Sequence, residues 1–231
     1  MRNCLFLSTL GRYGLCRAGG KAATLVLTIV HLCLFSPVWA RDTVTVLMLG
    51  DSLTQGYGLP PAEGLVSQLD RWLQEQGADA QLVNAGVSGD TTAGGAARVE
   101  WSLTPEIDAM VVALGGNDLL RGLDPEAARG NLQRILDVAQ TRDLPVLLVG
   151  MQAPGNFGPE YKSAFDRIYP DLAEAYQVLF FPDFFKGLGD GDLASLQRYF
   201  QPDGIHPNAA GVAEIVVAMG PSVLELIAQA R

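Results

Sequence analysis

The sequence predicts an α/β protein built on a five-stranded parallel sheet with helices on both faces. Five short apolar runs recur along the chain, and segments with helical spacing of apolar residues separate them. This alternation is typical of βαβ units, whose crossover helices cover both faces of a parallel sheet. Hydrophobic residues make up 48% of the chain and charged residues 18%, so the protein can bury a substantial core.

The expected strands are continuous apolar runs such as VTVLML and AMVVAL, without the alternation of a half-exposed strand. Continuous runs are typical of parallel strands that are buried on both faces. The five expected strands are Val44–Leu49, Ala80–Asn84, Ala109–Leu114, Val146–Met151 and Val178–Phe181.

Helical spacing of apolar residues predicts that the segments between the strands, and the segment after the last strand, are helices. The expected helices are Leu65–Gln76, Thr91–Trp101, Pro125–Gln140, Pro159–Tyr176 and Pro207–Ala230. Asp90 and Asp124 are candidate N-caps for the second and third of these, because a carboxylate can accept the free N–H groups of a first helical turn. Pro170 is expected to break or kink the fourth helix, and Gly220-Pro221 to divide the last one.

Residues 1–40 have the features of a secretory signal peptide. Residues 1–21 carry four basic side chains and no acid, residues 22–35 are nearly all apolar, and Ala40 offers a small residue before the cut. The apolar stretch is shorter than the roughly 20 residues of a spanning helix. We therefore expect cleavage after Ala40, one catalytic domain over residues 41–231, and a periplasmic or secreted protein. An uncleaved N-terminal anchor is the alternative.

Removal of this segment changes the chemistry that is available to the domain. All three cysteines and one of the two histidines leave with it, so a disulfide or a Cys/His metal site is excluded, and we expect no metal and no cofactor. Four of the 16 basic residues also leave and all 25 acidic residues stay, which takes the net charge from −9 to −13. Such a charge argues against nucleic acid as a partner.

Small polar segments follow the expected strands, at the edge where parallel sheets place their ligand sites. Each should face the same crevice. They are Gly50-Asp51-Ser52, Asn84-Ala85-Gly86 and Gly115-Gly116-Asn117, joined near the C-terminus by Asp203-Gly204-Ile205-His206.

These segments contain the groups of a serine hydrolase. Ser52 lies at a strand-to-helix turn, and a serine hydroxyl needs an adjacent base to act as a nucleophile. His206 is the only imidazole left after removal of residues 1–40, so it must be that base. Asp203 is three residues away, close enough to hold the imidazole in one tautomer.

Acyl transfer also needs hydrogen-bond donors for the oxyanion and an apolar surface for the substrate. The candidate donors are the backbone N–H groups of Ser52 and Gly86 and the side-chain amide of Asn117. Leu53 beside the nucleophile and Phe157 in a Pro- and Gly-rich loop are candidate substrate-binding residues. Covering the sheet end is their other possible role.

The four segments resemble the four sequence blocks of the SGNH, or GDSL, hydrolase family, whose invariant letters fall on Ser52, Gly86, Asn117 and His206. Residues 149–176 further resemble its bacterial thioesterase I, lysophospholipase L1 and arylesterase members. The resemblance covers essentially all of residues 41–231. It implies a flavodoxin-like three-layer α/β/α fold with five parallel strands.

The same resemblance implies a triad of Ser52, Asp203 and His206 and an oxyanion hole formed by Ser52, Gly86 and Asn117. The implied activity is hydrolysis of aryl and acyl esters, lysophospholipids and acyl thioesters. Contact with a membrane would come only through the export signal or a lipid substrate. A carbohydrate deacetylase of the same family and a non-catalytic binding module remain as alternatives. An α/β-hydrolase is excluded, because the chain has no Gly-x-Ser-x-Gly motif.

Overall fold

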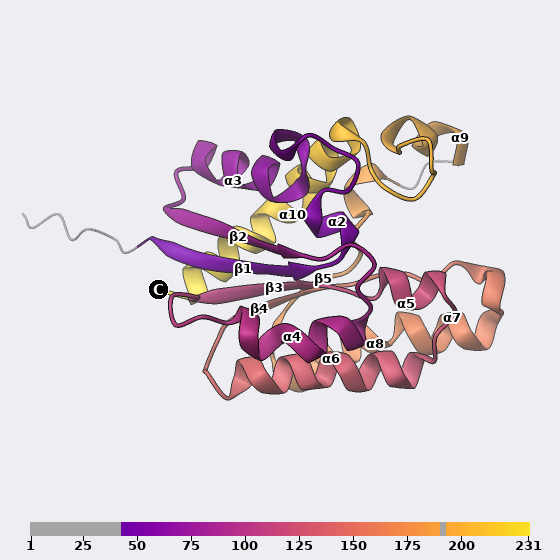
Figure 1. The fold of residues 1–231 in the computed structure, drawn as a ribbon, viewed down its shortest axis with the longest axis horizontal. Coiled ribbons are helices and arrows are strands. Elements are labelled where there is room, and N and C mark those ends of the chain that lie inside the picture. The colour runs from indigo at the N-terminus through magenta and orange to yellow at the C-terminus, as the bar shows by residue number, and fades with distance from the viewer. Residues whose placement is uncertain (1–42, 190–192) are drawn as a thin grey trace, which may run out of the picture. The chain divides into compact units, whose positions relative to one another are not determined.

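Five parallel strands in the order β2-β1-β3-β4-β5 form the central sheet of the computed structural model (Figure 1). The structure describes residues 43–189 and 193–231, so the expected signal peptide lies outside the described residues. The strands are β1 (Val44–Gly50), β2 (Ala80–Gly86), β3 (Ala109–Ala113), β4 (Val146–Val149) and β5 (Leu179–Phe181). All five expected strands are present, with ends shifted by one or two residues.

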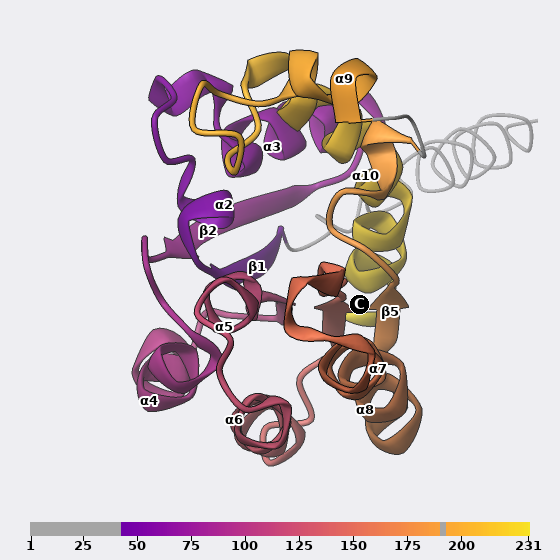
Figure 2. The ribbon, with the colours of Figure 1, turned by 90° about the vertical axis from the view of Figure 1, so that its right-hand side faces the viewer.

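Helices cover both faces of this sheet, which confirms the predicted three-layer fold. Figure 2 shows α3 and α10 on one face and α4, α6 and α8 on the other. These helices are α3 (Leu65–Glu75), α4 (Thr92–Ser102), α6 (Pro125–Gln140), α7 (Pro159–Asp166), α8 (Ile168–Tyr176) and α10 (Ala209–Gln229). Strand order reverses between β1 and β3, and ligands of such sheets bind at this switch point.

The central strands are buried on both faces, as their continuous apolar runs predict. Every residue of β3 and β4 is buried, and only one residue of β1 is not. The edge strand β2 is only partly covered. The core therefore holds the middle of the sheet rigidly, while its carboxyl edge remains open for loops.

One predicted helix cap is confirmed and the other is wrong. Asp124 caps α6, and its Oδ1 accepts a hydrogen bond from the Glu126 N–H at 3.1 Å. The cap of α4 is Thr91 rather than Asp90. Asp90 instead forms an ion pair with Arg98 at 2.7 Å, which takes its carboxylate away from the helix end.

The two prolines expected to interrupt helices behave differently. The fourth helix breaks at Arg167, and Pro170 lies in the first turn of α8, where a missing N–H leaves no helical bond unmade. By contrast, α10 runs unbroken through Pro221, so the predicted division is wrong. Buried residues lie on both sides of Pro221, and packing against the sheet outweighs the local cost of about 3 kcal/mol.

The apolar helix α10 belongs to the core. By length and composition it could cross a membrane, but it packs beside α3 with nine of its residues buried. The absence of a side chain at Gly220 leaves room for the Trp72 ring, because a Cβ there would lie 2.5 Å from the ring. Burial of α10 in the core therefore accounts for its high hydropathy.

Several short helices lie in the loops at the carboxyl edge and were not predicted. Two of them, α2 (Ser52–Gln55) and α5 (Gly116–Leu120), start immediately after β1 and β3. The others are the α-helix α9 (Leu193–Leu196) and the 3-10 turns η1 (Pro61–Glu63), η2 (Gly155–Phe157), η3 (Lys186–Leu188) and η4 (Gln197–Tyr199). At three to five residues, they are too short for periodicity to detect.

Candidate active site

The turn that carries Ser52 is built by its two preceding residues. Gly50 ends β1, and a Cβ there would lie 2.0 Å from Thr54 Oγ1, so only glycine fits. Asp51 caps α2, and its Oδ1 accepts from the Leu53 N–H at 3.0 Å. Ser52 is thus the first residue of a helix that points its N-terminus toward the carboxyl edge of the sheet. The helix cap, Asp51, and the expected nucleophile, Ser52, are therefore adjacent residues.

The structure brings together the three side chains expected to form a triad. His206 Nε2 lies 2.9 Å from Ser52 Oγ, although 154 positions separate the two residues in sequence. His206 Nδ1 lies 2.7 Å from Asp203 Oδ2. This geometry lets the imidazole take a proton from the serine hydroxyl while the carboxylate holds the opposite ring nitrogen.

Backbone hydrogen bonds keep Asp203 ionised. Its Oδ1 accepts from the N–H groups of His206 at 3.0 Å and Ile205 at 2.9 Å. With the contact to the imidazole, these bonds lower the pKa of Asp203 to about 2. The carboxylate therefore carries its charge throughout the range in which an imidazole base works.

Two residues that were not predicted to lie beside the imidazole support His206. The Tyr57 ring lies against the imidazole with 4.6 Å between ring centroids. Gln201 Nε2 donates to the carbonyl groups of Tyr57 at 2.8 Å and Pro207 at 3.0 Å. Gln201 thereby ties the loop after α2 to the loop of His206. No local pattern marks the contacts of Tyr57, because they join segments more than 140 positions apart.

Asn117 lies in the first turn of α5, directly beyond β3. Its Nδ2 donates to Asp51 Oδ2 at 3.3 Å, which links the residue to the Ser52 turn. The buried position of Asp51, 1% exposed, raises its pKa to about 6, mainly through loss of hydration. A costly buried carboxylate thus lies between the expected nucleophile and one expected oxyanion donor.

Replacement of Asp51 by Asn should therefore have a pH-dependent effect on stability. The pKa of Asp51 in the folded protein, about 6, is above the ordinary aspartate value of 3.8, so the wild-type protein loses stability as pH rises between these values. The loss amounts to about 3 kcal/mol. The free energy of unfolding would be measured with urea from about pH 4 to about pH 7 for both proteins. Over this range the stability of Asp51→Asn relative to wild type should rise by about 3 kcal/mol. A difference that does not vary with pH would contradict the assignment.

The expected oxyanion role of Gly86 is not supported by the structure. Its N–H donates to Asn84 Oδ1 at 2.9 Å. The next N–H, of Val87, bonds to Gly50 O across the sheet, and alternate N–H groups of an edge strand point in opposite directions. The Gly86 N–H therefore points away from β1 and is already occupied.

Gly86 has a packing role instead. A Cβ there would lie 2.3 Å from the Gln55 N atom and 2.8 Å from Asp51 O, which are backbone atoms of the nucleophile turn. Glycine lets the edge strand approach α2 closely.

Gly86→Ala should destabilise the fold, because the contacts are with backbone that cannot turn aside. We expect a loss of about 1–3 kcal/mol in the free energy of unfolding, measured with urea. Gly155→Ala is the matched control, since no atom of the described part of the chain lies within 4 Å of its Cβ position. Equal stability of the two variants would contradict the packing role.

Gly89, three residues further on, is better placed than Gly86 to offer an N–H group. It has a left-handed backbone, with φ of +85°. Its carbonyl accepts from Arg121 Nη2 at 2.9 Å, which ties this loop to the end of the α5 segment. Within residues 43–189 and 193–231, no hydrogen bond engages its N–H.

Leu53 and Phe157 lie on different elements of the carboxyl edge. Leu53 belongs to α2 and is partly buried against the core. Phe157 is 43% exposed, lies 5.1 Å from the Tyr161 ring, and covers Gly122 in the loop after α5. Phe157 therefore borders the loop that follows Asn117, which is compatible with contact to a substrate and with simple cover of that loop.

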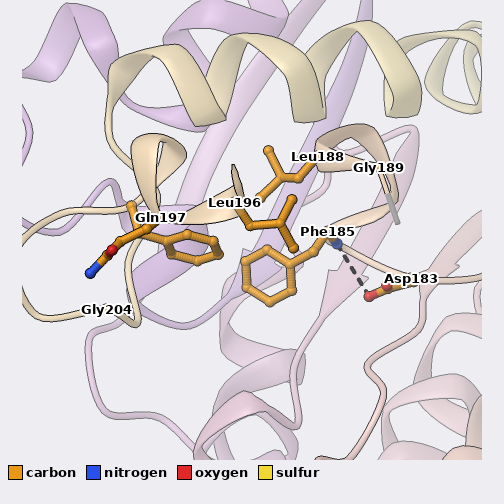
Figure 3. Close-up of a pocket in the computed structure, with 8 residues that line it drawn as sticks. Asp183, Phe185, Leu188, Gly189, Leu196, Gln197 and Gly204 are labelled. Carbon is orange, nitrogen blue, oxygen red and sulfur yellow. Dashed lines mark hydrogen bonds between the residues drawn. The ribbon is translucent and has the colours of Figure 1, made fainter. Parts of the chain in front are cut away.

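An apolar cavity of about 640 Å³ borders the loop of Asp203 and His206 through Gly204. Figure 3 shows the side chains of Phe185, Leu188 and Leu196 gathered around it. The remaining lining residues are Asp183, Gly189, Gln197 and Phe200. Burial raises the pKa of Asp183, whose Oδ1 accepts from the Phe185 N–H. The cavity comes from residues that the sequence analysis did not single out.

The geometry has counterparts in known proteins. The model of the GDSL-like lipase/acylhydrolase family matches residues 48–213. Esterase TesA of Pseudomonas aeruginosa is 39% identical over 184 residues, covering 79% of this chain and 89% of that protein. The arylesterase of Vibrio mimicus is 34% identical over 182 residues, covering 78% and 86%.

A solved structure supports the same assignment. The SGNH-hydrolase family esterase AlinE4 superimposes with a TM-score of 0.66 at 43% identity, over 80% of this chain and 96% of that chain. The family model includes Ser52 and His206, and the structural match has the same sheet architecture. The chain belongs to the GDSL-like lipase/acylhydrolase family, whose members named here hydrolyse ester bonds.

Proposed function

We propose that this protein is a serine esterase that hydrolyses carboxylic esters and thioesters through an acyl-enzyme. The observation that carries the proposal is the continuous hydrogen-bonded line from Ser52 Oγ through His206 to Asp203. Serine, imidazole and carboxylate in this order are the groups that activate a hydroxyl nucleophile. A non-catalytic binding module would not require a serine, an imidazole and a carboxylate in this hydrogen-bonded series.

The proposed reaction has two halves. Ser52 Oγ attacks the carbonyl carbon while its proton passes to His206 Nε2, and the carbonyl oxygen becomes an oxyanion. The C–O or C–S bond then breaks, and the imidazolium gives its proton to the leaving alcohol or thiol. Water then attacks the acyl-serine and gives its proton to His206 Nε2. The bond from the acyl carbon to Ser52 Oγ breaks, the imidazolium returns the proton to Ser52 Oγ, and the acid is released. Asp203 stabilises the imidazolium in both halves.

The proposed oxyanion hole has three donors, and Gly89 replaces Gly86 among them. The Ser52 N–H lies at the N-terminus of α2, where backbone donors are not used within the helix. The Asn117 amide is held next to the same turn by its hydrogen bond to Asp51, the residue before Ser52. The Gly89 N–H is supported by its lack of an acceptor among the described residues and by the Arg121 contact that ties its loop to α5.

The proposed substrates are aryl and acyl esters, lysophospholipids and acyl thioesters. Relatives are named esterase, arylesterase, and thioesterase 1/protease 1/lysophospholipase L1. Leu53 beside Ser52 in α2, Phe157 over Gly122 in the loop that follows α5, and the cavity beside Gly204 are the apolar surfaces proposed for the acyl group. Export by residues 1–40 to the periplasm or the medium is part of the proposal, and lipid substrate is the expected membrane contact.

A chain-length series tests the substrate class. Purified residues 41–231 would be assayed on p-nitrophenyl esters and acyl-CoA thioesters of increasing acyl length, with an acetylated sugar beside them. We expect turnover of acyl esters that exceeds release of acetate from the sugar. Preference for the acetylated sugar would favour a carbohydrate deacetylase instead, and no turnover of any ester would favour a binding module.

Activity should fall in acid, because a protonated imidazole cannot accept the serine proton. The measurement is kcat/KM on a p-nitrophenyl ester from about pH 5 to about pH 8. Asp203, with a pKa of about 2, does not titrate in that range, whereas Asp51, with a pKa of about 6, does, so the profile is measured on Asp51→Asn as well. A flat profile would count against His206 as the base.

A further inference from the structure

We infer that Asp51 is a positioning residue for catalysis, whose carboxylate sets the orientation of the Asn117 amide in the oxyanion hole. This inference rests on the proposed esterase function. The sequence predicts a catalytic role for Ser52 but none for its neighbour Asp51. Its contacts in the folded protein suggest a second task.

The two carboxylate oxygens of Asp51 bond to different elements. Oδ1 accepts from the Leu53 N–H and caps α2, while Oδ2 accepts from Asn117 Nδ2 in α5. Oδ2 also lies against Gly116, where a Cβ would approach it to 3.1 Å. One side chain thus joins the turn after β1 to the turn after β3, the two elements at the switch point of the sheet.

The chemistry of the pair determines which end of the amide faces Asp51. Above about pH 6 the ionised carboxylate of Asp51 has no donor, so it can pair only with the Nδ2 end of Asn117 and not with its Oδ1. One Nδ2 hydrogen is thereby used, and the second has a fixed direction. Without this partner, the amide could turn over and present its carbonyl oxygen, which would repel an oxyanion.

Helix capping alone does not explain a buried carboxylate here. A serine or threonine side chain caps a helix without a charge, and only Oδ1 of Asp51 serves the cap. Burial opposes the charge, as does Asp118 from α5, whereas His206 from the C-terminal loop favours it. Asp51 in turn disfavours ionisation of Tyr169 from α8. The cost of keeping a carboxylate at this site is consistent with a catalytic task for Oδ2.

The test is a double-mutant cycle of Asp51→Asn and Asn117→Ala, with kcat and KM measured on a p-nitrophenyl ester. Asp51→Asn keeps the shape of the side chain and an oxygen for the Leu53 cap, but it turns an N–H₂ group toward Asn117. The two amides can then pair only if Asn117 turns over. We expect kcat to fall about 100-fold with KM nearly unchanged, as for loss of one oxyanion donor.

The double variant should be no slower than Asn117→Ala alone, because Asp51 acts through that amide. Asp124→Asn, at the cap of α6, is the matched control and should keep wild-type activity. Unfolding curves would show that each variant is folded. Effects that multiply in the double variant, or a fully active Asp51→Asn, would overturn the inference.

Failure of the inference can be told apart from failure of the proposed function. If Ser52→Ala abolishes turnover while Asp51→Asn leaves it unchanged, the esterase proposal stands and only the role of Asp51 is lost. If Ser52→Ala is as active as wild type, both fall.

Discussion

Ser52→Ala should lower kcat by at least about 10⁴-fold on any ester that the protein hydrolyses. The variant lacks the oxygen that forms the acyl-enzyme. Among the described residues, His206 Nε2 also loses its hydrogen-bond partner, Ser52 Oγ. The residual rate would reflect substrate binding and oxyanion donors acting on water. The measurement is kcat on a p-nitrophenyl ester, with the release of nitrophenol followed by absorbance.

Three comparisons sharpen this expectation. Ser88→Ala is a matched control, because Ser88 is an exposed serine whose hydroxyl bonds to Gln55 and not to the triad. His206→Ala should lose activity to a similar extent. The double variant of Ser52 and His206 should be no slower than either single one, since the two groups act as a unit. A Ser52→Ala protein that works at the wild-type rate would end the triad assignment.

Asp203→Asn is expected to lower kcat by about 10³–10⁴-fold while KM changes little. An amide in this position can donate as well as accept, so it no longer selects the His206 tautomer that leaves Nε2 free to take a proton. It also removes the charge that stabilises the imidazolium. The measurement is the same p-nitrophenyl assay at about pH 8.

Asp79→Asn serves as the control for Asp203→Asn, because Asp79 precedes β2 at the opposite end of the sheet. Unfolding curves should show at most a modest loss of stability for Asp203→Asn and little change for Asp79→Asn, since the Asp203 side chain is 37% exposed and its backbone hydrogen bonds lie within one loop. Near-wild-type activity of Asp203→Asn would mean that the backbone, rather than the carboxylate, holds His206 in place.

The fold was predictable because its signals are local. Each central strand is a continuous apolar run, which is typical of a strand buried on both faces of a parallel sheet. Each long helix has its own apolar face. Errors occurred where packing outweighs local preference. Pro221 continues a helix because residues on both sides are held against the sheet, and Asp90 leaves the end of α4 because Arg98 attracts it.

The candidate site was predictable in its side chains but less so in its backbone. Ser52, Asn117 and His206 stand out because their residue types follow strand ends or lie in the C-terminal loop. A backbone N–H carries no such mark. Whether Gly86 or Gly89 offers one depends on the direction of each peptide in the edge strand and on the Asn84 side chain, which the letters do not reveal.

From residue order alone came the α/β class, the strands, the family and the three side chains of the triad, since strand ends of one parallel sheet must meet at one edge. The folded chain was needed for the contacts across that edge: Tyr57 on His206, Gln201 between two loops, and Asp51 on Asn117. These contacts join residues distant in sequence, and hydrogen bonds depend on directions and distances of a few tenths of an ångström. Such directions are a property of packing and register, which no local pattern specifies.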